Sequence, residues 1–373
     1  MGIIREEFDK ILDEIGNCAH FKAIENLKRA QAGRPIVLYG CGQICKVVIS
    51  ICVQKGIEIA SLCDSNKTGI YEETGYSIIS PIELIEKYSD AVILITSQRF
   101  EKEITEQLRR FGFSDKQIYP FPFLHAYVMN PKNFEEFHLK GFEQAYDFFK
   151  DNMSREIILD RMRMHLLGTS LSKTSNASIY FEPGVINLSQ NEVFVDGGCF
   201  KGETVEEFIK QIEIRNVGGY SHIYSFEPDA MTCKIAIENL ENYKNIDVIA
   251  KGLWSSETEL KFFSDGGSGG SSFVLGQTSV SVIVMSLDKF FDGKTEYELP
   301  TFIKMDIEGA EKEALIGAKN VIKQNHPKLA ICVYHKPEDI YELPQLIYEI
   351  DPSYKFTLQQ CADGVYDTVL YAV

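Results

Sequence analysis

Residues 194–204 read FVDGGCFKGET, and this stretch decides the fold of the second half of the chain. Its apolar start predicts a buried strand that ends at Asp196. Gly198 and Gly202 predict a tight turn, and from Thr204 onward the apolar residues have the spacing of an amphipathic helix. A strand, a glycine-rich turn and a helix in this order are typical of the first unit of a doubly wound α/β sheet. In such a sheet, ligands bind at the carboxyl ends of the strands.

The charge of this turn indicates its ligand. With lysine at position 203 the stretch would match the phosphate-binding loop of an ATPase, but the chain has Glu203 there. Asp196 and Glu203 would repel a triphosphate, whereas they favour a cationic ligand. S-adenosylmethionine carries a sulfonium and an ammonium group and no phosphate, and Asp196 can accept a hydrogen bond from the ammonium. Gly197 and Gly198 let the backbone approach such a ligand closely. We therefore predict S-adenosylmethionine as the cofactor.

The second strand of this half ends in IYSFEPD and places Glu227 at its carboxyl end. A carboxylate at this position can accept hydrogen bonds from both ribose hydroxyls, as in dinucleotide sites. The alternative is an acidic residue that only caps the following helix. The complete set of predicted cofactor-binding residues is Asp196, Gly197, Gly198, Gly202, Thr204, Glu227, Pro228, Asp229, Gly252 and Leu253.

The stretch FIKMDIEGAE contains Lys304, Asp306 and Glu308 in alternation, so their side chains face one side. Charged residues are seldom buried in a strand without partners, so one interpretation is a local ion pair between Lys304 and a carboxylate. The other interpretation is catalytic, because the carboxyl end of this strand borders the reactive methyl group. All three are catalytic candidates, and so is His335 at the end of LAICVYH, although a lone histidine is more often structural. Asp306, Glu308 and His335 are the candidate general bases.

Two absent motifs favour oxygen as the methyl acceptor. Enzymes that methylate bases and amide nitrogens commonly use an Asn/Asp-Pro-Pro-Tyr/Phe motif. This motif does not follow the strand in FIKMDIEGAE, and the chain has no Pro-Cys nucleophile.

The composition disfavours several other classes of function. The 373 residues suggest about two domains, and the formal net charge of -16 disfavours nucleic acid as a partner. The nine cysteines are scattered, without a CxxC pair or a Cys/His cluster, so we expect reduced core residues and no metal site. No apolar run is long enough to span a membrane. The acidic, amphipathic N-terminus is unlike a signal peptide, so we expect a cytoplasmic location.

Alternating strands and helices predict an α/β fold of two doubly wound, Rossmann-like domains. In the second domain, five parallel strands precede two terminal strands, KFTLQQ and TVLYAV, whose short connection makes them antiparallel. This is the layout of a class I methyltransferase. ELKFF and VSVIVMS should form an extended pair around a flexible loop at 264–272. The predicted divisions are an N-terminal helix (1–34), a Rossmann-like domain (35–128), a helical linker (129–178) and a methyltransferase domain (179–373).

The second half of the chain resembles the FkbM-type methyltransferases. The resemblance covers about residues 179–373 and rests on FVDGGCFKGET, YSFEPD, MSLDKFF, IKMDIEGAE and HPKLAICVYH, in that order. The chain departs from the usual pattern at Cys199 and at the Gly197–Gly198 pair, and neither change blocks the cofactor sterically. The resemblance implies an S-adenosylmethionine-dependent enzyme. Most such enzymes are O-methyltransferases, often found with glycan and secondary-metabolite pathways.

The first half resembles small Rossmann-like domains attached to sugar-modifying enzymes. LYGCGQIC has two of the three glycines of a dinucleotide turn, with Cys45 at the third position, and Asp64 ends the next strand. Such domains bind nucleotide sugars or serve as docking platforms, and we favour a scaffold or dimerisation role.

The expected activity is O-methylation of a hydroxyl group on a carbohydrate or related metabolite. The partner is then a small-molecule or glycan acceptor, and a homodimer is compatible with the sequence. The alternative is a non-catalytic nucleotide or sugar-nucleotide binding protein with two Rossmann-like domains. A dehydrogenase that uses NAD would need a Tyr/Lys or His/carboxylate set after the first domain, and we find none there.

Overall fold

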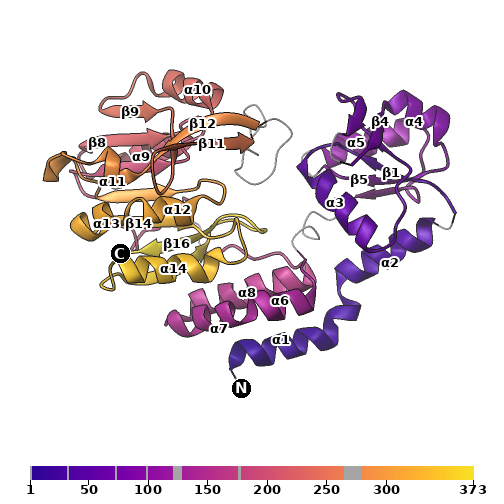
Figure 1. The fold of residues 1–373 in the computed structure, drawn as a ribbon, viewed down its shortest axis with the longest axis horizontal. Helices are drawn as coiled ribbons and strands as arrows, with labels where there is room; N and C mark the ends of the chain where they lie inside the picture. The colour runs from indigo at the N-terminus through magenta and orange to yellow at the C-terminus, as the bar shows by residue number, and fades with distance from the viewer. Residues whose placement is uncertain are drawn as a thin grey trace. The chain divides into compact units, whose positions relative to one another are not determined.

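The computed structural model describes residues 2–31, 33–71, 74–97, 100–120, 128–174, 178–263 and 279–373. The chain divides into two compact units (Figure 1). The N-terminal unit comprises 8–131 and 163–169, and the C-terminal unit comprises 1–7, 132–162 and 170–373. The predicted domain boundaries at 34, 128 and 178 stay predictions. The predicted loop at 264–272 lies outside the described residues.

The N-terminal unit contains a six-stranded sheet in the order β3-β4-β2-β1-β5-β6. All neighbouring strands are parallel except β3 and β4, which form an antiparallel hairpin. Its strands are β1 (Ile36–Tyr39), β2 (Ser61–Cys63), β3 (Gly69–Tyr71), β4 (Tyr76–Ile79), β5 (Val92–Ile95) and β6 (Ile118–Pro120). Its helices include α2 (Ala19–Gln31), α3 (Gln43–Gln54), α4 (Pro81–Lys87) and α5 (Glu101–Arg110), and α1 (Ile3–Glu14) and the short η1 (Ile15–Asn17) precede them. Because β1 and β5 are buried on both faces, they are continuous apolar runs rather than alternating ones.

The C-terminal unit contains a seven-stranded sheet in the order β15-β16-β14-β13-β7-β8-β9. Five strands, from β14 to β9, are parallel, and β16 is antiparallel to both β14 and β15. Its strands are β7 (Val193–Gly197), β8 (His222–Phe226), β9 (Ile246–Ile249), β13 (Phe302–Met305), β14 (Lys328–Cys332), β15 (Phe356–Gln360) and β16 (Thr368–Ala372). The class I methyltransferase layout and the antiparallel terminal pair are therefore confirmed.

A smaller sheet in the same unit has the order β10-β12-β11. The predicted extended pair is present as β11 (Thr258–Phe263) and β12 (Ser279–Met285), which are antiparallel. The sequence analysis did not predict the third strand, β10 (Gly252–Leu253), which is parallel to β12.

Three of the described helices of the C-terminal unit precede its first strand, β7, and the others follow its strands along the chain. In chain order, the helices are α6 (Pro131–Phe137), α7 (Leu139–Phe148), α8 (Asn152–Leu167), α9 (Glu203–Ile214), α10 (Ala230–Leu240), α11 (Leu287–Phe290), η3 (Glu296–Glu298), α12 (Glu311–Ile316), α13 (Lys319–Asn325) and α14 (Asp339–Ile350). Helices α7 and α14 pack against each other (Figure 1). Among the described residues, no helix is long and apolar enough to cross a membrane.

Aromatic rings form the centre of the core between the seven-stranded sheet and α9. The rings of Phe194 and Phe208 are stacked with centroids 4.5 Å apart, and Phe302 lies 5.0 Å from Phe194. All three side chains are fully buried. Because Phe194 and Phe302 face each other across β7 and β13, this packing fixes the register that brings Asp196 opposite Lys304.

Candidate active site

The glycine turn after β7 is shaped by contacts within the chain. Gly198 has φ +76°, and a Cβ there would lie 2.0 Å from the backbone oxygen of Asp306. A Cβ on Gly197 would lie 2.9 Å from Leu253 Cδ1. The sequence analysis explained these glycines by the approach of a ligand. The structure adds a second reason, because the strand exit after β13 and Leu253 occupy the space that side chains at 197 and 198 would take, and the approach of a ligand stays a prediction.

Lys304 lies beneath this turn and holds it to the sheet. Its ammonium donates to Asp196 Oδ1 at 2.9 Å, to the Gly197 carbonyl at 3.1 Å and to the Gly198 carbonyl at 2.8 Å. Burial alone would lower the pKa of Lys304, but the neighbouring carboxylates raise it, so the side chain stays charged. The ion-pair interpretation of Lys304 therefore has direct structural support. With all three donors engaged, Lys304 positions the turn and has no donor left for a substrate.

Glu227 connects the turn to the end of β8. Its Oε2 accepts from the Phe200 backbone N–H at 3.1 Å, and its Oε1 accepts from the Asp229 N–H at 2.9 Å. Burial raises the pKa of Glu227 to about 7, although these two hydrogen bonds oppose the shift. Asp229 caps α10, since its Oδ1 accepts from the Thr232 N–H at 2.8 Å. Asp229 therefore caps a helix, which was the alternative that the sequence analysis gave for an acidic residue at this strand end.

The remaining predicted cofactor residues lie around the same turn. Gly202 precedes α9 with φ +98°, and a Cβ there would lie 3.0 Å from Leu240 Cγ. Thr204 is half-buried in the first turn of α9, and Pro228 is half-buried next to Glu227. Gly252 and Leu253 form β10, where Leu253 is buried close to the turn.

Asp306 is the centre of a polar cluster at the exit of β13. Its Oδ2 accepts from the Tyr180 hydroxyl at 2.7 Å, and its Oδ1 accepts from the Tyr334 hydroxyl at 3.0 Å. His335 Nε2 lies 3.4 Å from Oδ1. Burial would raise the pKa of Asp306, but the positive charges of His335 and Lys304 lower it below its usual range. Asp306 is therefore an ionised carboxylate whose two oxygens already have hydrogen-bond donors.

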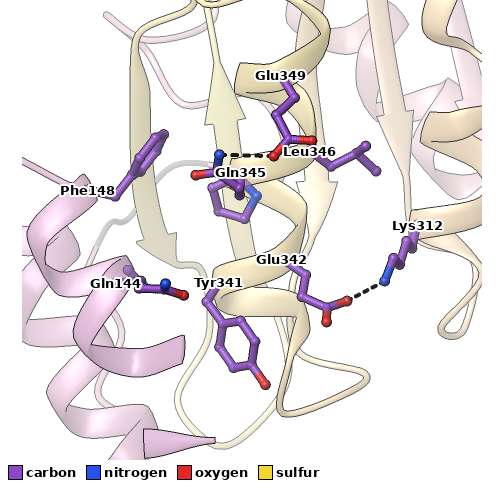
Figure 2. A pocket seen from close by; sticks show the side chains of 10 residues that line it. Gln144, Phe148, Lys312, Tyr341, Glu342, Gln345, Leu346 and Glu349 are labelled. Atoms are coloured by element: carbon purple, nitrogen blue, oxygen red, sulfur yellow. Dashed lines mark hydrogen bonds and ion pairs between the residues drawn. The ribbon is translucent and has the colours of Figure 1, made fainter. Parts of the chain in front are cut away.

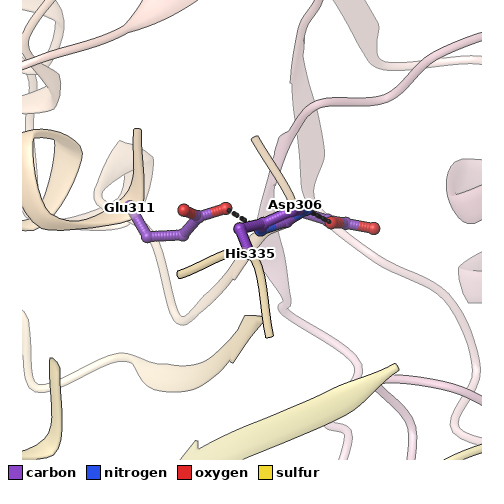
Figure 3. A group of neighbouring side chains, drawn as sticks. All are labelled: Asp306, Glu311 and His335. Atoms are coloured by element: carbon purple, nitrogen blue, oxygen red, sulfur yellow. Dashed lines mark ion pairs between the residues drawn. The ribbon is translucent and has the colours of Figure 1, made fainter. Parts of the chain in front are cut away.

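His335 lies between carboxylates (Figure 3). Its Nδ1 is 3.1 Å from Glu311 Oε1, and its Nε2 is 3.6 Å from Glu308 Oε2. Burial would lower the pKa of His335, but Glu311, Asp306 and Glu308 raise it to about 10. Glu308 has φ +57° and a side chain that is 41% exposed, and desolvation raises its pKa to about 7.

The structure thus brings most of the predicted residues together and adds three that the sequence analysis missed. Asp196, Glu227 and Asp306 lie at the ends of neighbouring parallel strands, with Glu308 and His335 beside Asp306. The missed residues are Glu311, Tyr334 and Tyr180. Glu311 ends the quoted FIKMDIEGAE stretch and Tyr334 precedes His335, so both were within reach of the same motifs. Nothing in the sequence near Tyr180 indicated its contact with Asp306.

A separate pocket of about 570 Å³ lies between α7 and α14 (Figure 2). Phe148 and Tyr341 contribute to its wall, and Lys312 pairs with Glu342 at its edge. None of its lining residues is a predicted site residue.

In the N-terminal unit, Asp64 serves the turn rather than offering a free carboxylate. Its Oδ2 accepts from the Cys41 N–H at 2.8 Å, and its Oδ1 accepts from the Asn66 N–H at 2.8 Å. Lys67 donates to the Cys41 carbonyl at 2.8 Å. These bonds stabilise the strand ends themselves, so a nucleotide site in this unit stays a prediction.

Comparisons with known proteins identify the class of the C-terminal unit. Residues 197–359 match the family model described as "Methyltransferase FkbM domain", and residues 33–119 match "C2185-like, N-terminal". No curated protein matches the chain in the sequence search. Methyltransferase FkbM from Methylobacillus flagellatus KT has a similar structure, with a TM-score of 0.64, 21% identity, and coverage of 100% of this chain and 99% of that one. This likeness shows the fold.

Two further solved structures cover half of the chain. Fibrillarin from Aeropyrum pernix with bound S-adenosyl-L-methionine has a TM-score of 0.31 and 11% identity, over 51% of this chain and 70% of that one. A methyltransferase-like protein from Streptococcus mutans in complex with SAH has a TM-score of 0.31 and 14% identity, over 50% of this chain and 91% of that one.

Residues 197–359 therefore belong to the FkbM methyltransferase family, and the protein is an S-adenosylmethionine-dependent methyltransferase. The residues at the carboxyl edge fit this cationic cofactor. Asp196 Oδ2 is buried without a hydrogen-bond partner, and Glu227 and Glu308 add two carboxyl groups whose pKa values desolvation raises to about 7.

Proposed function

We propose that the protein methylates a hydroxyl group of a carbohydrate or a related small metabolite in the cytoplasm. The observation that carries the proposal is the meeting of Asp196, Glu227, Asp306 and Glu308 at one sheet edge. Asp196 lies near the end of β7, whereas Glu227 follows β8 and the other two follow β13, and these three strands are adjacent and parallel. In an open α/β sheet, the carboxyl edge near the first strand is where ligands bind.

Two buried carboxylates would hold the cofactor. Each oxygen of Glu227 accepts only one backbone hydrogen bond, so a lone pair on each remains for a ribose hydroxyl. Asp196 Oδ2 has no partner and would accept from the ammonium. Gly202 and Thr204 bring the start of α9 to the same place. The bound cofactor would supply an electrophilic methyl group on a positively charged sulfur.

Glu308 is the best placed proton acceptor among the three predicted bases. Asp306 already accepts from two tyrosine hydroxyls, and His335 lies between carboxylates with little exposed surface. Glu308 has a side chain that is 41% exposed and is next to Asp306. We infer that a Glu308 carboxylate oxygen takes the hydroxyl proton, while the methyl group would pass from the sulfur to the acceptor oxygen and S-adenosylhomocysteine would leave. The proton then passes to solvent.

A methyl-transfer assay tests this function. Labelled S-adenosylmethionine is incubated with the full chain and a panel of monosaccharides, oligosaccharides and nucleotide sugars, and methyl ethers are detected by mass spectrometry. We expect Glu308→Gln to lower kcat by about 10²–10⁴-fold, because the base is lost. Glu241→Gln, at an exposed position after α10, is the control and should keep full activity.

The outcomes separate the competing functions. Methylation of amines but of no hydroxyl compound would contradict the oxygen acceptor. Binding of S-adenosylhomocysteine without any methyl transfer would favour the non-catalytic nucleotide-binding alternative.

A further inference from the structure

We propose that Asp306, Glu311 and His335 bind a divalent metal ion of the first transition row, such as Mn²⁺. Each of the three offers one ligand atom, and these atoms all lie within 4.8 Å of one another. Figure 3 shows the imidazole between the two carboxylates. The sequence analysis predicted no metal site, because these residues come from two strand exits and a helix and have no metal-binding spacing in the chain.

Each ring nitrogen of His335 lies near one of the two carboxylates. His335 Nδ1 is 3.1 Å from Glu311 Oε1, and His335 Nε2 is 3.4 Å from Asp306 Oδ1. Atoms that each lie about 2.1 Å from one metal ion are about 3–3.4 Å apart in octahedral or tetrahedral geometry. The two carboxylates lie at opposite ring nitrogens, so one ion would bind a single nitrogen together with the carboxylate beside it, and the other carboxylate would have to turn toward the same point.

Unsatisfied polar atoms give independent support. The His335 side chain is nine-tenths buried, at 10% exposure, and neither of its ring nitrogens has a hydrogen bond of acceptable geometry. Glu311 is fully buried, and its Oε2 also has no partner. Buried polar atoms in native proteins nearly always have partners, so such a group calls for an explanation. A bound cation would replace the proton on one His335 nitrogen and would give Glu311 a partner.

The carboxylates are held in place by contacts outside the group. Tyr180 and Tyr334 donate their hydroxyls to Asp306, and the backbone N–H of Ile307 donates to Glu311 Oε1 at 2.9 Å. Metal ligands are commonly oriented by such neighbours, and losing them weakens metal binding. The site would therefore be preformed rather than assembled from mobile side chains.

The donor set selects the class of ion. Carboxylates suit Mg²⁺ and Mn²⁺, whereas imidazole suits the first-row transition metals. Two carboxylates with one imidazole and no thiolate match Mn²⁺ on both counts. The negative charge around the group also suits a divalent cation, because Glu308 adds a third carboxylate 3.6 Å from His335 Nε2.

The role of the ion rests on the proposed function. Asp306 follows β13 and lies against the Gly198 turn, where we place the cofactor. A metal ion at Asp306 would hold the acceptor hydroxyl there and lower its pKa. The hydroxyl proton would then pass to Glu308 Oε, which stays outside the ligand set.

The test is a titration of the chelator-treated full chain with Mn²⁺, in which free Mn²⁺ is followed by electron paramagnetic resonance without cofactor or acceptor. We expect one Mn²⁺ per chain. Glu311→Gln and His335→Gln should each lose at least about tenfold in affinity. His326→Gln is the matched control, because His326 pairs with the single carboxylate of Asp351 and should leave Mn²⁺ binding unchanged.

Calorimetry with S-adenosylhomocysteine on the same samples separates this proposal from the proposed function. If the wild-type chain binds S-adenosylhomocysteine but not Mn²⁺, the metal site is overturned and the proposed function is not. Unchanged Mn²⁺ affinity in His335→Gln would overturn it as well. If Glu311→Gln does not fold, as judged by its melting curve, His335→Gln and the wild-type stoichiometry decide the question.

Discussion

At the scale of single residues, Lys304 is a fully buried cation that holds the glycine turn through Asp196 and two backbone carbonyls. Lys304→Met would leave the buried Asp196 carboxylate without its counter-charge. We expect a loss of about 3–5 kcal/mol in the free energy of unfolding, measured by urea denaturation. Lys312→Met removes an exposed ion pair with Glu342 and should cost less than about 1 kcal/mol. Equal losses in the two variants would contradict the role assigned to Lys304.

Gly198 provides a second test at this scale. An alanine there would combine a left-handed backbone with a Cβ 2.0 Å from the Asp306 carbonyl oxygen. Gly218 has a similar φ of +97°, but a Cβ there meets nothing within 4 Å. We expect Gly218→Ala to cost about 1–2 kcal/mol for the backbone alone. Gly198→Ala should cost more than about 3 kcal/mol and abolish cofactor binding. Comparable melting temperatures for the two variants would contradict a rigid contact between position 198 and the Asp306 carbonyl oxygen.

Residues at strand ends were predictable because their position follows from the apolar run before them. Asp196, Glu227 and Asp306 each end such a run, and parallel strands place their carboxyl ends at one edge. The contact of Tyr180 with Asp306 could not be predicted in this way. It depends on how a segment that lies before β7 packs against two strand exits, which no local pattern describes.

At the scale of elements, α7 and α14 meet at a glycine. A Cβ on Gly141 would lie 2.6 Å from the ring of Tyr341. Alanine normally favours a helix over glycine by about 1 kcal/mol, so the helix itself would gain. We nevertheless expect Gly141→Ala to lower the melting temperature, because the ring cannot stay against the helix. Combining it with Tyr341→Ala should remove this extra cost. A melting temperature raised by Gly141→Ala alone would contradict the close packing of the two helices.

The sheet elements differ in how far the sequence predicted them. The parallel strands of the seven-stranded sheet are short apolar runs separated by helix-length segments, so their order along the chain was clear. Strand β10 has only two residues and exists because it pairs with β12. A strand this short has no periodicity of its own, and only its tertiary partner defines it.

At the scale of the whole molecule, both halves of the chain match known protein families. The structural likeness to the FkbM methyltransferase of Methylobacillus flagellatus covers 100% of this chain. The acceptor is the part that neither the motifs nor the fold defines, because acceptor specificity depends on loops around the edge rather than on the sheet. The predicted homodimer and the cytoplasmic location stay predictions for the same reason: neither follows from the fold.

Cofactor binding should depend on pH through Glu227. Burial raises the pKa of this carboxyl from 4.5 to about 7, so it is largely protonated below that pH and ionised above it. Only the ionised form accepts hydrogen bonds from both ribose hydroxyls. The affinity for S-adenosylhomocysteine should therefore rise between pH 6 and about 8, and Glu227→Ala should remove the part of this rise that Glu227 causes.

The most direct test of the central claim is calorimetric titration of the full chain with S-adenosylhomocysteine at about pH 8. We predict micromolar binding by the wild type. The affinity should fall at least about tenfold in Glu227→Ala, because two hydrogen bonds to a charged group are lost. Glu241→Ala, at an exposed position, should bind like the wild type. Unchanged affinity in a folded Glu227→Ala variant would contradict the ribose site, and no binding by the wild type would contradict the cofactor site at this sheet edge.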